Sequence, residues 1–126
     1  MLRACWRVLR PGGRLAFYTI FVPPGLSQAD QRRALRSGPP AVASGRRAHA
    51  DLLLSAGFTR PAETDLTADF LRTARAWYEG RERRATELRA AEGEASFAEG
   101  QADRRRQLRA IEAGLLRRSL FVARRP

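Results

Sequence analysis

The sequence of 126 residues contains no lysine, one cysteine and one histidine, and it has no long hydrophobic run. The single cysteine, Cys5, excludes an intrachain disulfide, and its place on the apolar side of a predicted helix indicates a buried thiol. No apolar stretch is as long as a membrane span. Arg3, Arg7 and Arg10 interrupt the N-terminal segment, which therefore lacks the apolar core of a secretory signal. These absences predict a cytoplasmic protein without a membrane segment.

Candidates for acid–base chemistry or metal binding are few. His49 is the only imidazole available as a general base. It follows Arg46 and Arg47 in the first turns of a predicted helix, so a solvent-facing position is favoured. No carboxylates recur with the spacing of metal ligands; those considered are Asp69, Glu79 and Glu82. The sequence therefore predicts no metal site, and it identifies no catalytic residue.

All 24 basic residues are arginines, and the formal net charge is +11 with a pI near 11.6. Such an excess raises the expectation of an anionic partner, above all nucleic acid. The arginines, however, are scattered along the chain in pairs and triples, without a zinc-finger spacing or an aromatic RNA-binding signature. Solvated faces are the favoured interpretation. An anion-binding surface is the alternative.

The opening stretch MLRACWRVLRPGGRLAFYTIF predicts a helix, a turn and a strand. Apolar residues recur at helical spacing before the glycines, and a nearly continuous apolar run from Leu15 to Val22 follows them. A phosphate-binding loop needs the reverse order, a strand and then a helix. Gly12 is therefore expected to be the left-handed cap of the first helix.

The rest of the chain alternates between helices and strands. Ser27 predicts a helix cap before residues 30–35, and Ser44 predicts another for a helix that ends at Gly57. The strand after Phe58 contains Pro61, which cannot donate to a ladder, so this strand is expected at a sheet edge. Two long helices after Thr67 are expected to form an antiparallel hairpin that turns at residues 92–94, and a short buried strand follows at residues 119–123.

Three of these segments resemble class I S-adenosylmethionine-dependent methyltransferases. RVLRPGGRLAF is similar to the helix and fifth strand of that family, LLLSAGF to the helix before the sixth strand, and SLFVARRP to the seventh strand. The resemblance covers nearly the whole chain and implies an α/β fold. The expected fold is the C-terminal half of a Rossmann-like methyltransferase sheet, with strands 5, 6 and 7 and the seventh antiparallel between the others, plus an inserted helical hairpin. The single partial domain 1–126 then divides into 1–66, the hairpin 67–116 and the last strand 117–126.

The resemblance does not extend to the family's cofactor site. In that family S-adenosylmethionine binds at a glycine-rich loop after the first strand and at an acidic residue after the second, which hydrogen-bonds its ribose. The sequence has no Gly-x-Gly, and no strand precedes Met1. We therefore expect no cofactor-binding residue here and a truncated methyltransferase that is inactive alone, through a misplaced start, a gene remnant or a split enzyme.

The resemblance implies a small-molecule methyl acceptor for the full enzyme. Tyr18, Thr19 and Phe21, at the end of the fifth strand, are the candidates on the acceptor side of the pocket, with ordinary packing as the alternative. Trp77 and Tyr78 on the hairpin are candidates for a lid. Core packing is the alternative favoured for these two aromatic residues.

The fifth strand would lack a neighbour on one side. An open apolar edge of this kind favours self-association. Two other functions stay open: an arginine-rich module that binds nucleic acid, and a non-catalytic subunit that recruits a cofactor-binding half through the open edge.

Overall fold

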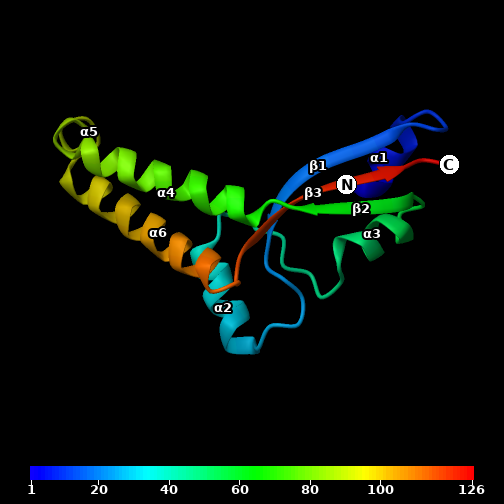
Figure 1. Cartoon of the computed structure of the whole chain (residues 1–126), viewed down its shortest axis with the longest axis horizontal. Helices are drawn as coiled ribbons and strands as arrows, with labels where there is room; N and C mark the ends of the chain where they lie inside the picture. The colour runs from blue at the N-terminus through cyan, green and yellow to red at the C-terminus, as the bar shows by residue number, and fades with distance from the viewer.

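The computed structural model describes all 126 residues and confirms a mixed α/β fold (Figure 1). Six helices and three strands follow one another along the chain: α1 (Leu2–Val8), β1 (Arg14–Phe21), α2 (Gln28–Ser37), α3 (His49–Ser55), β2 (Thr59–Asp65), α4 (Thr67–Arg83), α5 (Ala85–Glu92), α6 (Glu94–Glu112) and β3 (Arg117–Arg124). The sheet has the order β1-β3-β2, and β3 is antiparallel to both neighbours. The two outer strands therefore run parallel to each other, as expected. No helix has the length and apolar character needed to cross a membrane.

The turn between α1 and β1 differs from the expected helix cap. α1 ends at Leu9, whose backbone is extended, and the glycines belong to a separate tight turn. In this turn the Gly13 amide donates to the Arg10 carbonyl at 2.9 Å, and Gly12 has a φ of +78°. Pro11 at the second position and a left-handed glycine at the third form the pattern of a type II turn. Gly12 is left-handed, but it closes this turn and not the helix.

The predicted helix start at Ser44 is wrong, because α3 begins only at His49. The residues before it stay extended: Ala43 forms a parallel bridge with Phe21, and its carbonyl accepts the Val22 amide at 2.8 Å. The other end of α3 agrees with the prediction. Gly57 has a φ of +96°, and the Phe58 amide donates to the Leu53 carbonyl at 3.1 Å, as in a Schellman cap.

β2 is an edge strand, as Pro61 predicted. Its pairing with β3 is irregular between Thr59 and Ala62, and Arg60 has a φ of +49°. This irregularity is a β-bulge, which bends the strand where the proline has no amide hydrogen to donate.

The structure has two adjoining hydrophobic cores, one at the sheet and one where α2 meets the base of the hairpin. The sheet core packs α1 and α3 on one face of the sheet around Leu53, Phe58 and Phe121, each at most 2% exposed. The helical core joins α2 to α4 and α6 around Ala34, Ile111 and Leu116. Phe21 belongs to the sheet core and Val22 to the helical core, so the two cores adjoin at the end of β1. The helical part of the molecule begins beyond this end of the sheet (Figure 1).

The hairpin contains three helices where two were expected. The helical geometry breaks at Arg84, between α4 and α5. The expectation that Trp77 packs in the core is wrong, since this side chain is 64% exposed. The half-buried positions of α4 include Ala74 and Tyr78, one residue away from Trp77. At this level the hairpin interior is polar, because buried Gln101 donates to the Tyr78 carbonyl at 3.3 Å.

Candidate functional site

A groove lies between α6 and the end of α2, at the carboxyl ends of both parallel strands. α2 follows β1 and the hairpin follows β2, so both structures extend from the same end of the sheet (Figure 1). Ligands of open α/β folds bind beyond the carboxyl ends of the strands. We call this space, of about 680 Å³, the α2–α6 groove.

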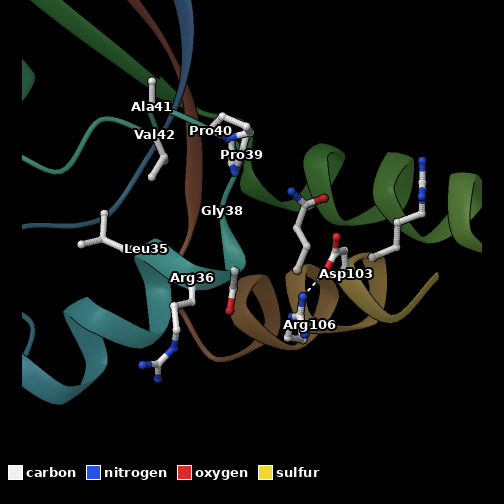
Figure 2. Close-up of a pocket in the computed structure, with 12 residues that line it drawn as sticks. Leu35, Arg36, Gly38, Pro39, Pro40, Ala41, Val42, Asp103 and Arg106 are labelled. Atoms are coloured by element: carbon white, nitrogen blue, oxygen red, sulfur yellow. Dashed lines mark hydrogen bonds and ion pairs between the residues drawn. The ribbon is translucent and has the colours of Figure 1, made fainter. Parts of the chain in front are cut away.

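The α2–α6 groove has one wall from α2 and the loop after it and another from α6. Figure 2 shows Arg36 at the end of α2, the loop from Gly38 to Val42, and Asp103 and Arg106 on α6. Gly38 at the start of this loop packs closely on the helical core, since a Cβ there would lie 3.2 Å from carbons of Leu116 and Val42, a tight contact. The helical core thus fixes the loop that forms one wall.

The groove is electropositive. An adjoining space of about 550 Å³ shares Arg36 and Arg106 and adds Arg33 and Arg109, with no acidic residue in its lining. Arg106 forms an ion pair with Asp103. No carboxylate lies within salt-bridge distance of the other three arginines, whose charges are therefore available to an anion.

Arg104 lies on the side of α6 that faces the interior of the hairpin. Its guanidinium donates to the Gly100 carbonyl at 3.0 Å. Burial and the neighbouring Arg81 lower the pKa of Arg104, and the carboxylate of Glu92 opposes this shift. Arg104 and Gln107 line both the α2–α6 groove and a smaller hollow beside Trp77, so α6 separates two solvent-accessible spaces.

The structure does not bring the predicted acceptor-side residues to the α2–α6 groove. Tyr18 is 58% exposed, and with Thr19 it borders a different hollow along β1. Phe21 is only 6% exposed and packs in the sheet core, with its ring centroid 6.0 Å from that of Phe121. The sequence signals nearest the groove are the arginine triple Arg104-Arg105-Arg106, of which Arg104 and Arg106 line it, and the pair Arg32-Arg33, of which Arg33 lines the adjoining space. Sequence alone does not show that these two helices face each other.

The two predicted lid residues lie in different environments on the hairpin. Trp77 is exposed and borders the smaller hollow opposite Arg118. Tyr78 is half-buried, and its hydroxyl accepts a hydrogen bond from Arg105 at 3.2 Å. The two side chains therefore point into different surroundings.

His49 does not face solvent, contrary to the expectation. Its ring stacks on Phe121 with centroids 4.7 Å apart and meets the edge of Phe21 at 5.0 Å. Burial lowers the pKa of His49, and the negative charge of Glu63 partly offsets that effect. His49 is thus an aromatic packing residue of the sheet core, and no hydrogen bond to a carboxylate orients it as a base.

The residues present do not fit S-adenosylmethionine. No group of three or more His, Cys, Asp and Glu gathers in a way that could hold a metal ion. A hollow of about 330 Å³ beside the end of β1 is lined by Pro23, Pro24, Gly25 and other residues, without a carboxylate for ribose hydroxyls. The loop from β1 to α2 contains Pro23 and Pro24, which have no backbone amide hydrogen to donate to a ligand. Neither a Gly-x-Gly loop nor a carboxylate for the ribose, the two features of the cofactor site in the family this chain resembles, is present at this hollow.

Comparison with known proteins identifies the fold. No protein-family model matches the chain, and no curated protein is detectably similar in sequence. Among solved structures, phosphoethanolamine N-methyltransferase 2 of Haemonchus contortus, in complex with phosphomonomethylethanolamine and S-adenosylhomocysteine, superposes with a TM-score of 0.82 at 17% identity. A structure from Galdieria sulphuraria assigned as a sarcosine dimethylglycine methyltransferase gives 0.81 at 16% identity.

The superpositions include nearly all of this chain and a minor part of the others. They cover 99% of this chain and 29% of the Haemonchus protein, and 98% of this chain and 46% of the Galdieria protein. The chain therefore has the fold of the C-terminal part of S-adenosylmethionine-dependent methyltransferases, and it spans less than half the length of the neighbours it matches. The fold expected from LRPGG and AGF is confirmed.

Proposed function

We propose that this chain is the acceptor-binding portion of an S-adenosylmethionine-dependent methyltransferase and is inactive without the cofactor-binding portion. One observation carries the proposal: the whole chain, including the hairpin, superposes on methyltransferases with TM-scores above 0.8. The misfit between its residues and the cofactor supports the proposed inactivity of the chain alone. What remains for this chain is to hold the methyl acceptor in position. Positioning is a large part of catalysis when one substrate is already activated.

The α2–α6 groove is the proposed acceptor site, and a small molecule with an anionic group is the proposed acceptor. Arg36 in the groove and Arg33 and Arg109 in the adjoining space have no acidic partner, which favours an anion over a neutral or cationic ligand. The groove's place at the carboxyl ends of β1 and β2 agrees with this role. The Haemonchus structure contains a phosphate ester, phosphomonomethylethanolamine, which supports a phosphate as the anionic group.

Calorimetric titration of phosphomonomethylethanolamine into the chain tests the acceptor site. We expect saturable binding that is lost with N-methylethanolamine, because that compound lacks the phosphate. Arg36→Gln should weaken binding at least about tenfold, equivalent to ~1.4 kcal/mol. Arg32→Gln is the matched control: Arg32 lies on the same helix but does not line the groove, so binding should stay unchanged.

Equal binding of the two compounds, or equal losses in the two variants, would contradict an anion site in the groove. Nucleic-acid binding is a distinct candidate, favoured by the same arginines and the net charge of +11. It predicts an affinity for oligonucleotides that falls steeply with salt and responds to both variants alike. The matched pair therefore separates the two functions.

A further inference from the structure

The smaller hollow beside Trp77, of about 370 Å³, is lined by residues of α4, α6 and β3. We call it the Trp77 hollow. Phe70 and Trp77 lie along its α4 wall, and Arg104 and Arg118 come from the other two elements. The hairpin that carries most of this lining extends from the sheet on the side opposite to both chain termini (Figure 1). The hollow is thus a feature of the hairpin and the start of β3.

Trp77 presents an aromatic surface that the chain itself leaves uncovered. Its side chain is 64% exposed, whereas Phe70 on the same helix is 6% exposed. The Trp77 ring takes part in none of the aromatic or cation–π contacts within the chain. The other tryptophan, Trp6, is covered by the Arg125 guanidinium at 3.9 Å. The indole of Trp77 is therefore available for stacking with a planar ring.

Two arginines of the Trp77 hollow carry charges that no acidic residue of its lining neutralises. Neither Arg104 nor Arg118 forms a salt bridge. The guanidinium of Arg118 lies 5.3 Å from the centre of the Tyr18 ring, a contact that orients it and leaves its charge intact. Glu92 acts on Arg104, but this carboxylate is itself paired with Arg81 at 2.6 Å. An anion in the hollow would therefore meet two guanidinium groups.

The Trp77 hollow differs from the α2–α6 groove in the chemistry that it offers. The two spaces share Arg104 and Gln107, but the lining of the groove and of its adjoining space contains no aromatic residue. The hollow combines an exposed indole with arginines. A ligand that contains both a ring and a negative charge would therefore favour the hollow, because only there can both of its parts bind.

We propose that the Trp77 hollow binds an aromatic anion, a small molecule in which a planar ring is joined to a phosphate or carboxylate group. The ring stacks on the indole of Trp77, and the anionic group accepts hydrogen bonds from Arg104 and Arg118. This inference goes beyond the proposed function and does not rest on it, since the acceptor proposed for the α2–α6 groove needs no ring.

Titration of phenyl phosphate into the whole chain tests the site, with the two indole N–H signals followed by NMR. Loss of one signal in Trp77→Leu identifies the Trp77 resonance. Trp6 is the internal reference, because its N–H donates to the Gly57 carbonyl at 3.1 Å. We expect a saturable shift of the Trp77 signal alone. The affinity should be at least about tenfold higher than that of methyl phosphate, which has no ring, and of phenol, which has no negative charge.

Three arginine variants locate the anionic group. Arg118→Gln should weaken the binding of phenyl phosphate at Trp77 at least about fivefold, because it removes one guanidinium of the hollow. Arg83→Gln is the matched control, since Arg83 is exposed on α4, forms no salt bridge and does not line the hollow. Arg36→Gln changes only the α2–α6 groove. Both of these variants should leave the affinity at Trp77 unchanged.

Several results would overturn the proposal. They are an unshifted Trp77 signal, equal affinities for phenyl phosphate and phenol, and equal losses in the Arg118 and Arg83 variants. A loss in Arg36→Gln as large as that in Arg118→Gln would assign the ligand to the α2–α6 groove instead. A thymidine oligonucleotide is the last probe, because its bases and phosphates offer the same chemistry. Tighter binding of the oligonucleotide with a steep salt dependence would assign the hollow to nucleic acid and not to a small molecule.

Discussion

The two edges of the sheet are built differently. The β2 edge has Pro61, a bulge with Arg60 in the left-handed region, and the carboxylates of Glu63 and Asp65. The β1 edge is a regular ladder of eight residues without proline, bulge or acid. Proline, bulges and charges are the features by which proteins protect an exposed strand edge from pairing. The difference indicates that β2 ends the sheet, whereas β1 is suited to a further neighbour.

The largest expected loss of stability comes from a substitution that weakens the packing of both outer strands at once. Phe121 lies at the centre of β3, between the two outer strands, and is 2% exposed. Phe121→Ala removes its stacking on His49 and Phe17 and leaves a cavity in the sheet core. We expect a loss of about 3–5 kcal/mol in the free energy of unfolding, measured by urea denaturation. A loss below ~1 kcal/mol would mean that the sheet core does not hold the two edges together.

A smaller effect should come from loosening the β1 side alone. Arg125, after β3, donates to the Trp6 carbonyl at 2.8 Å and to that of Leu9, and its guanidinium stacks 3.9 Å from the Trp6 ring. These bonds satisfy the last carbonyls of α1. Arg125→Ala should cost about 2 kcal/mol and speed exchange in α1. The exposed neighbour Arg124 has no such contact, so Arg124→Ala is the control and should change stability little. Equal losses of stability in the two variants would contradict a stabilising role for the bonds between Arg125 and α1.

The smallest effect should appear at the β2 side and depend on pH. Asp65 accepts hydrogen bonds from the Thr67 amide at 2.9 Å and the Thr67 hydroxyl at 2.6 Å, and Arg117 pairs with it at 2.7 Å. The hydrogen bonds from Thr67 lower the pKa of Asp65 to about 2. Because the folded-state pKa is depressed, the stabilisation is complete above pH ~4 and is lost as the pH falls toward 2.

Asp65→Asn should remove that pH dependence. The side chain is half exposed, so the expected contribution is only about 0.5–1 kcal/mol. Urea midpoints of the two proteins should differ at pH 6 and converge as the pH approaches 2. A constant difference across this range would show that the carboxylate charge has no part in the effect.

Local patterns predicted most of the fold. The apolar run after Gly13, the left-handed Gly57 and the proline in β2 each determine structure within a few residues, and all three are confirmed. The prediction that a helix begins at Ser44 was wrong because the Ala43 carbonyl accepts the amide of Val22, a distant residue, and this bond keeps the chain extended. The prediction that Trp77 packs in the core was wrong. The amide group of Gln101 occupies the hairpin interior, which an amphipathic pattern assigns to apolar side chains.

The site was less predictable than the fold. The α2–α6 groove and its adjoining space combine Arg33 and Arg36 with Arg106 and Arg109, which lie about seventy residues further along the chain. Nothing in the spacing of either pair shows that two helices bring them together. The position of His49 against Phe121 has the same cause, since a contact between a helix and a distant strand leaves no local signal.

The central claim is that this chain holds an acceptor and has no cofactor site of its own. Calorimetric titration of S-adenosylmethionine into the purified, folded chain tests it most directly. The account predicts no heat of binding at cofactor concentrations up to the millimolar range. Saturable binding with a micromolar dissociation constant would contradict it, because the residues at the end of β1 would then form a cofactor site that their geometry does not indicate.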